Sequence, residues 1–138
     1  MDIWKELQDE GIDAALLEEI RHFREAHPVP PEAQPRIPAP QCLYYGKEVW
    51  ESAAAALLCG QHLLLAGPKA TGKNVLAENL AMAFGRPAWD VSFHVNMDAA
   101  SLIGMDTFVG GQVTFRPGPV YLCAKNGGFG ILDEINMA

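Results

Sequence analysis

The stretch that decides the fold is HLLLAGPKATGKNVLA, residues 62–77. It begins with a short apolar run at 63–66, continues through a glycine-bounded segment at 67–73, and ends with apolar residues at helical spacing. A strand, a glycine-bounded loop and a helix in this order place backbone N–H groups and a helix N-terminus around an anion. Lys73 adds a mobile positive charge at the same point. The stretch therefore predicts a phosphate-binding loop.

The loop assigns one continuous run of residues to nucleotide binding: Gly67, Pro68, Lys69, Ala70, Thr71, Gly72, Lys73, Asn74 and Val75. One position departs from the pattern G-x-x-x-x-G-K-[ST], because Asn74 stands where a hydroxyl that binds Mg²⁺ is expected. The Asn74 oxygen is also a hard ligand, but the side chain reaches further and brings an NH₂ group beside the metal. We therefore expect weaker organisation of Mg²⁺ at Asn74, with nucleotide binding largely kept.

A second apolar run, at 129–132, ends in two adjacent carboxylates, Asp133 and Glu134. Because ligands bind at the carboxyl ends of parallel strands, this pair and the loop can meet at one edge of a sheet. Asp133 is predicted to orient Mg²⁺ through water, since Mg²⁺ keeps part of its hydration shell. Glu134 is predicted to be the catalytic base that polarises the water attacking the γ-phosphate of the bound nucleotide. An ordinary acidic turn after a strand is the alternative interpretation.

Composition excludes several other classes of protein. The 138 residues include 10 Lys and Arg against 17 Asp and Glu, a formal net charge of −7, which argues against a nucleic-acid-binding surface. The three cysteines are far apart and form no C-x-x-C pair, which indicates reduced thiols and no metal site. No apolar run approaches the ~20 residues of a membrane helix, and the acidic N-terminus lacks the apolar core of a signal peptide. We therefore expect a cytoplasmic protein.

The remaining patterns divide the chain into three parts. Two amphipathic helices, the first capped by Asp2, form an expected N-terminal helical segment at 1–27. Six prolines at 28–41 predict a semi-rigid linker with extended backbone. Residues 42–138 form the expected nucleotide-binding core. Its predicted elements are a helix from Gly46 to about residue 58, strands at 63–66, 88–93 and 129–132, the loop helix to about Phe84, short helices at 99–103 and 120–125, and a hairpin at 107–115 turning at Gly110 and Gly111.

From Leu63 to Ala138 the sequence resembles the MoxR-type, dynein-related branch of the AAA+ ATPases. The matching pieces are GPKATGKN for the Walker A loop, ILDEINMA for Walker B, and DAASLIGMD and FRPGPVYLCAKNGG between them. The resemblance implies an α/β fold of the P-loop NTPase type, with a parallel sheet flanked by helices. It also implies binding and Mg²⁺-dependent hydrolysis of ATP by copies assembled in a ring, usually a hexamer, that remodels or matures partner protein complexes.

The resemblance extends to partners and to further residues. Such ATPases commonly work with a protein that carries a von Willebrand factor A domain. Family members have hairpins near the ring pore, for which 107–115 is the candidate; a plain surface ribbon is the alternative. Asn136 would link the active site to the neighbouring subunit. Residues 44–46 stand where family members contact adenine, although an aromatic pair packed under the core fits equally well.

The chain stops four residues after Glu134, before the later strands, sensor, arginine finger and lid of the family. In the family strand order 5-1-4-3-2, the fourth strand separates the strands of Walker A and Walker B. We therefore expect an N-terminal part of a longer protein, with an incomplete sheet and two open sheet edges. An arginine finger contributes about 10³–10⁵ in rate, so we expect this chain alone to turn over ATP very slowly.

Two other functions fit the same motifs. One is a nucleotide-binding regulatory module with weak or no hydrolysis, in which Asn74 marks the weakened catalysis. The other is an AAA+ NTPase that acts on nucleic acid, which the acidic charge disfavours. The loop sequence leaves the choice between ATP and GTP open, because it encodes no contact to the base.

Overall fold

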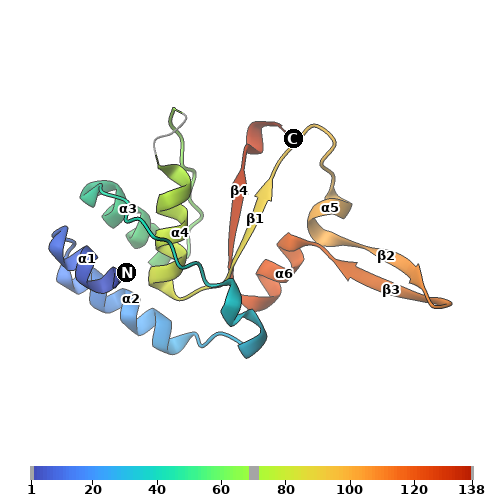
Figure 1. Ribbon diagram of the computed structural model, residues 1–138, viewed down its shortest axis with the longest axis horizontal. Coiled ribbons are helices and arrows are strands. Elements are labelled where there is room, and N and C mark those ends of the chain that lie inside the picture. The colour runs from blue at the N-terminus through green and yellow to red at the C-terminus, as the bar shows by residue number, and fades with distance from the viewer. Residues whose placement is uncertain (1, 69–71, 138) are drawn as a thin grey trace.

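The computed structural model describes residues 2–68 and 72–137. In chain order the elements are α1 (Ile3–Asp9), α2 (Ala14–Ala26), the 3₁₀ helix η1 (Pro31–Arg36), α3 (Lys47–Leu58), α4 (Lys73–Phe84), β1 (Ala88–Ser92), α5 (Ala99–Ile103), β2 (Gly104–Val109), β3 (Gln112–Pro117), α6 (Pro119–Asn126), β4 (Phe129–Asp133) and the 3₁₀ helix η2 (Ile135–Met137). The first helices gather at one end of the molecule, β1 and β4 stand beside α4, and the β2–β3 hairpin extends from the other end (Figure 1).

The central sheet is a parallel pair. β1 and β4 run side by side, with Ala88 opposite Phe129 and Ser92 opposite Asp133. The strands predicted at 88–93 and 129–132 are confirmed to within a residue at their ends. Because parallel neighbours need a long connection, the chain leaves the sheet after β1 and returns through α5, the hairpin and α6. The class is therefore α/β, with a parallel sheet and flanking helices.

The strand predicted at 63–66 is not present, and that expectation was wrong. Residues 61–67 run without regular secondary structure, and Leu64 is 83% exposed. An apolar segment becomes a strand only when a neighbour completes its backbone hydrogen bonds, and among the described residues β4 pairs only with β1. Leu63 and Leu65 nevertheless pack against the hydrophobic core, while Leu64 between them is exposed. The segment therefore keeps the alternating side-chain directions of a strand without the hydrogen bonds to a neighbouring strand.

The N-terminal helices share one hydrophobic core with α3 and α4. The Asp2 carboxylate caps α1, accepting hydrogen bonds from the N–H groups of Trp4 and Lys5, and the Asp13 carboxylate caps α2. Leu7 and Ile20 are fully buried, and each contributes roughly 1.5–3 kcal/mol through burial. The buried residues of this cluster are Ile3, Leu7, Ile12, Leu17, Ile20, Leu43, Trp50, Ala53, Ala54, Leu76, Leu80, Ala83 and Phe84. The division into parts at 1–27, 28–41 and 42–138 stays a prediction.

The proline-rich segment is not extended throughout. Residues 31–36 form the 3₁₀ helix η1, with proline at its first position, because the fixed φ of proline also suits the start of a helix. Arg36 donates a hydrogen bond to the carbonyl of Ala88 (3.2 Å), and its guanidinium lies 4.7 Å from the centre of the Trp89 ring. The segment therefore rests on β1.

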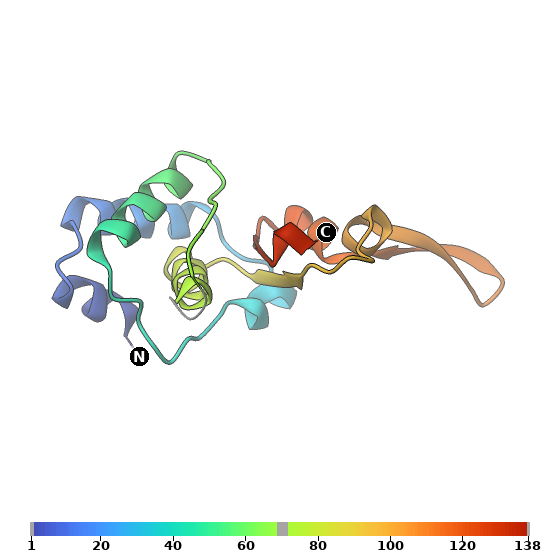
Figure 2. The ribbon, with the colours of Figure 1, turned by 90° about the horizontal axis from the view of Figure 1, so that it is seen from above.

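The hairpin confirms the turn predicted at Gly110 and Gly111 and is longer than expected. β2 and β3 pair from Gly104 opposite Pro117 to the tip, and Phe108 lies opposite Val113 as predicted. Figure 2 shows this ribbon projecting away from the rest of the molecule. At its base, the rings of Phe115 and Tyr121 meet edge to face with centres 5.1 Å apart.

Arg86 joins the ends of three elements. Its side chain is only 5% exposed and follows directly after α4 and its C-terminal cap, Gly85. The guanidinium donates hydrogen bonds to the carbonyls of His27, Asn126 (2.9 Å) and Gly127 (2.7 Å), which lie at the C-terminal ends of α2 and α6. Such carbonyls lack helical partners, so Arg86 satisfies them while holding the two helices to the core. Burial lowers the pKa of Arg86 from its ordinary value.

Within residues 2–68 and 72–137, no helix combines the length and the hydrophobicity needed to span a membrane.

Replacing Arg86 tests this connection. We expect Arg86→Met to lower the free energy of unfolding by about 2–4 kcal/mol, because three carbonyls lose a charged donor. The measurement is urea unfolding followed by circular dichroism. Arg21→Met is the control, since the Arg21 side chain is 41% exposed and donates to no backbone carbonyl among the described residues. Its ion pair with Glu18 (3.6 Å) and its contact with the Trp4 ring (4.9 Å to the ring centre) are each worth about 1 kcal/mol or less. Equal losses in both variants would contradict the role given to Arg86.

Candidate functional site

The glycine-bounded loop leads directly into α4. Gly67 and Pro68 are exposed, and Gly72 has a left-handed backbone (φ 84°) immediately before the first helical residue. The predicted binding residues Lys69, Ala70 and Thr71 lie outside the described residues. No side chain of the described part of the chain caps the N-terminus of α4. A helix N-terminus that follows a glycine-bounded loop is a common position for anion binding.

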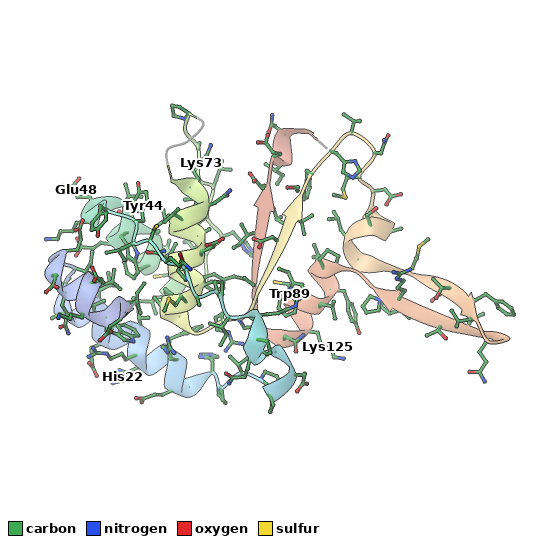
Figure 3. All side chains as sticks on the ribbon, viewed as in Figure 1. His22, Tyr44, Glu48, Lys73, Trp89 and Lys125 are labelled. Carbon is green, nitrogen blue, oxygen red and sulfur yellow. The ribbon has the colours of Figure 1, made fainter. Side chains whose placement is uncertain are left out.

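Lys73 spans the two ends of the loop. Its ammonium group donates a hydrogen bond to the carbonyl of Gly67 at 2.8 Å. Figure 3 shows Lys73 at the upper end of α4, next to the loop. The positive charge and the positive end of the helix dipole thus coincide at the place where the sequence predicts phosphate binding.

The two residues predicted to serve Mg²⁺ meet in one cavity. This cavity, of about 190 Å³, lies between α4 and the β1–β4 pair, and both Asn74 and Asp133 line it. Asn74 is in the first turn of α4, while Asp133 ends β4 at the carboxyl edge of the sheet. The remaining lining residues are Glu78, Asp90, Val91, Ser92 and Ile131. The juxtaposition predicted for the loop and the strand end is therefore present.

Three polar lining residues were missed from the sequence: Glu78, Asp90 and Ser92. Glu78 follows Asn74 by four positions, so the two share one face of α4. Asp90 and Ser92 alternate along β1 and face the same side of the sheet. These spacings were readable, but only the tertiary structure shows that the two faces line the same cavity.

Asp133 and Glu134 form a tight turn at the end of β4. The Asp133 carboxylate accepts a hydrogen bond from the N–H of Glu134 at 2.9 Å. Glu134 has φ 54° and is the one non-glycine residue with positive φ among those described, a conformation that costs about 1–2 kcal/mol. Its side chain is exposed, and Glu134 is not among the residues that line the cavity. The strain is of the kind that accumulates at functional sites.

The donor set fits a shared Mg²⁺ site. Among residues 2–68 and 72–137, no group of three or more His, Cys, Asp or Glu side chains is arranged to hold a metal ion. Mg²⁺ does not require such a cage, because it commonly takes one or two protein oxygens together with water and phosphate oxygens. Asp133 and Asn74 offer oxygens of that kind in one cavity, beside the positively charged loop.

The residues assigned to adenine and to the neighbouring subunit lie apart from this cavity. Tyr44 is half-buried, and its ring edge packs against Gly72 at the end of the loop. Tyr45, by contrast, is 71% exposed. Asn136 is exposed in η2, and Val75 is half-buried in the first turn of α4. Their proposed roles stay predictions.

A pair of glycine substitutions tests the packing of Tyr44 on the loop. Gly72 and Gly60 both have left-handed φ, so alanine at either position costs about 1–2 kcal/mol of unfolding free energy. At Gly72 a Cβ would also lie 3.2 Å from the Tyr44 ring, whereas at Gly60 no described atom comes within 4 Å. We expect Gly72→Ala to lower stability in urea more than Gly60→Ala. Equal losses would show that the ring does not confine Gly72.

Comparison with known proteins gives the family. Residues 62–138 match the AAA domain of the dynein-related subfamily. The chain is 34% identical over 137 residues to the uncharacterized protein YojN of Bacillus subtilis, covering 96% of this chain and 45% of that protein. It is 36% identical over 101 residues to the protein NorQ of Paracoccus denitrificans, covering 72% of this chain and 36% of NorQ.

A third relative is the uncharacterized protein SSP1341 of Staphylococcus saprophyticus, 37% identical over 95 residues, which is 65% of this chain and 36% of that protein. The chain thus spans less than half the length of these curated relatives. The family match begins one residue before the apolar run that leads into the loop and includes Asp133 and Glu134. The chain belongs to the dynein-related, MoxR-like AAA+ ATPases.

Proposed function

We propose that this protein binds ATP with Mg²⁺, hydrolyses it, and uses the cycle to remodel or mature a partner protein complex. The observation that carries the proposal is the meeting of Asn74 and Asp133 in one cavity beside the loop lysine, Lys73. The loop and the strand end come from distant parts of the sequence. Asp133 lies at the carboxyl end of β4, the edge of a parallel sheet at which nucleotides bind in α/β proteins.

In this proposal the loop residues Gly67–Val75 hold the nucleotide. Backbone amides and the N-terminus of α4 bind the phosphates of the nucleotide. The Lys73 ammonium group releases the Gly67 carbonyl and pairs with the β- and γ-phosphates, the outer two of the three. Asp133 orients Mg²⁺ through water, with the Asn74 oxygen as a second ligand. Bound Mg²⁺ supplies charge neutralisation on the phosphate oxygens.

Glu134 is the proposed catalytic base. Its carboxylate is exposed and follows the end of β4 directly, so it can accept a proton from water next to the cavity. The left-handed backbone at Glu134 fixes the turn from which the side chain leaves the strand. The hydrogen bond from the Glu134 N–H restrains the Asp133 carboxylate at the end of β4. In this proposal Asp133 therefore serves Mg²⁺, while the Glu134 carboxylate is left to accept the proton.

Partner remodelling is proposed for the full-length protein in the cytoplasm, in a ring of its own copies and with a von Willebrand factor A protein. Support comes from the family and from the projecting β2–β3 hairpin, on which Phe108, Val109 and Val113 are largely exposed. A two-stranded ribbon with exposed apolar side chains is marginally stable alone, which suits a surface that meets another chain. The parts 1–27, 28–41 and 42–138 would then be a helical segment, a linker and the nucleotide-binding core.

Two substitutions in the full-length protein separate binding from hydrolysis. We expect Lys73→Ala to weaken ATP affinity by about tenfold or more, because the phosphates lose their cation. We expect Glu134→Gln to keep affinity and to lower turnover by about 10²–10⁴-fold. Calorimetry measures binding, phosphate release measures turnover, and GTP is compared with ATP in both.

Lys47→Ala is the matched control for Lys73. Lys47 is exposed and begins α3 after Gly46, as Lys73 begins α4 after Gly72. The control should leave affinity and turnover unchanged. Unaltered ATP binding in Lys73→Ala would overturn the phosphate role of the loop, and unaltered turnover in Glu134→Gln would overturn the assignment of the base.

A regulatory module with weak hydrolysis is the second candidate, favoured by the Asn74 amide beside Asp133 in the cavity. If Asn74 weakens Mg²⁺ organisation, Asn74→Thr should raise turnover several-fold and lower the Mg²⁺ concentration needed for half-maximal activity. Both are measured by phosphate release in a Mg²⁺ titration. Unchanged turnover together with unchanged Mg²⁺ dependence would show that Asn74 does not set the rate.

A further inference from the structure

A polar side chain is fully buried in the middle of α4. Asn79 is 0% exposed, and its neighbours on the same helix, Leu76, Leu80 and Ala83, belong to the hydrophobic core. Burying an amide is unfavourable unless both its donor and its acceptor are bonded. The partners of Asn79 therefore explain why this position is polar.

Asn79 binds the backbone of a segment that lies far away in the sequence. Its side-chain oxygen accepts a hydrogen bond from the N–H of Tyr44 at 3.0 Å, and its NH₂ group donates one to the carbonyl of Cys42 at 2.9 Å. These two backbone groups flank Leu43, whose side chain is buried in the core. The carboxamide carries the same donor and acceptor as a peptide group, so Asn79 pairs with this segment as a neighbouring strand would.

The bonded segment places the Tyr44 ring on the phosphate-binding loop. A Cβ built at Gly72 would lie 3.2 Å from Cδ2 of Tyr44, and one built at Gly46 would lie 2.6 Å from Cε1. The ring thus fits between the last glycine of the loop and the glycine that begins α3. Figure 3 shows Tyr44 beside α4, the helix that Lys73 begins.

We propose that Asn79 is a positioning residue of the nucleotide site: its buried amide fixes the backbone at 42–44, and the Tyr44 ring in turn confines Gly72. This inference rests on the proposed nucleotide binding. Asn79 does not line the cavity, and its side-chain hydrogen bonds among the described residues go to the backbone of Cys42 and Tyr44, so it acts through Tyr44. An aliphatic side chain of similar size, such as leucine, would fill the same space. It would leave the Tyr44 N–H and the Cys42 carbonyl without hydrogen-bond partners.

The simpler alternative is that Asn79 only anchors 42–44 to the core. That role would change stability alone. Positioning through Tyr44 makes a further demand: the effects of Asn79 and Tyr44 on nucleotide affinity must overlap, because both remove the same restraint on Gly72. Overlap of this kind appears as non-additivity in a double-mutant cycle.

The experiment measures Mg²⁺–ADP affinity by calorimetry in the full-length protein at a temperature where every variant is folded. The variants are Asn79→Ala, Tyr44→Ala and the double variant. We expect each single variant to weaken affinity by about tenfold, and the double variant to be no more than about twofold weaker than either. Because Asn79→Ala leaves two backbone groups unpaired, Asn79→Asp is made beside it. Its protonated carboxyl group keeps an acceptor for the Tyr44 N–H and a donor for the Cys42 carbonyl, whereas the ionised form faces that carbonyl with no donor. Asn79→Asp should therefore lose less affinity at acidic than at neutral pH.

Leu80→Ala is the control for lost stability. Leu80 is the next residue of α4 and is equally buried, and its truncation should lower the melting temperature while leaving affinity within about twofold. Wild-type affinity in folded Asn79→Ala, or single losses that multiply in the double variant, would overturn the inference. If Lys73→Ala still weakens binding in that case, the proposed function survives. An absence of ADP binding by the wild-type protein would overturn both.

Discussion

Burial of α4 is the constraint on which the rest of the structure depends. The helix has apolar side chains on more than one face, and Leu76, Leu80, Ala81, Ala83 and Phe84 are all buried. Phe84 lies between the rings of Phe23 from α2 and Phe129 from β4, with ring centres 5.3 Å and 5.7 Å away. Phe84 thus links α4 to α2 on one side and to β4 on the other. Moving α4 would expose this whole set of side chains at once.

Both ends of α4 and its middle are also tied by polar contacts. Arg24 of α2 donates hydrogen bonds to the carbonyls of Met82 (2.8 Å) and Ala83 (3.1 Å) in the last turn. Asn79 holds the segment at 42–44 along the middle, and Lys73 closes onto Gly67 at the start. The helix N-terminus is thus aimed by packing and fixed by hydrogen bonds. A phosphate-binding site needs both, because N–H and ammonium donors that are already in place bind the phosphate without a further loss of conformational entropy.

Local signals in the sequence were sufficient for many elements. Asp98 precedes the short helix predicted at 99–103, and its carboxylate accepts hydrogen bonds from the N–H and hydroxyl of Ser101. These bonds hold the pKa of Asp98 below its ordinary value. Gly110 and Gly111 predicted a hairpin whose register the structure confirms. The predictions of secondary structure failed where the conformation of a segment depends on another segment that packs beside it. Residues 63–66 had the pattern of a strand but no ladder partner, and η1 replaced extended backbone in a segment that packs on β1.

The sequence by itself determined the loop, the order of elements around it and the acidic strand end, because each depends on residues close together in the chain. It could not determine which faces meet. Only the tertiary structure brought Asn74 and Asp133 into one cavity, added Glu78 and Asp90 to it, and gave partners to Asn79 and Arg86. Those contacts join residues tens of positions apart, so they depend on how the folded elements pack and not on any local pattern.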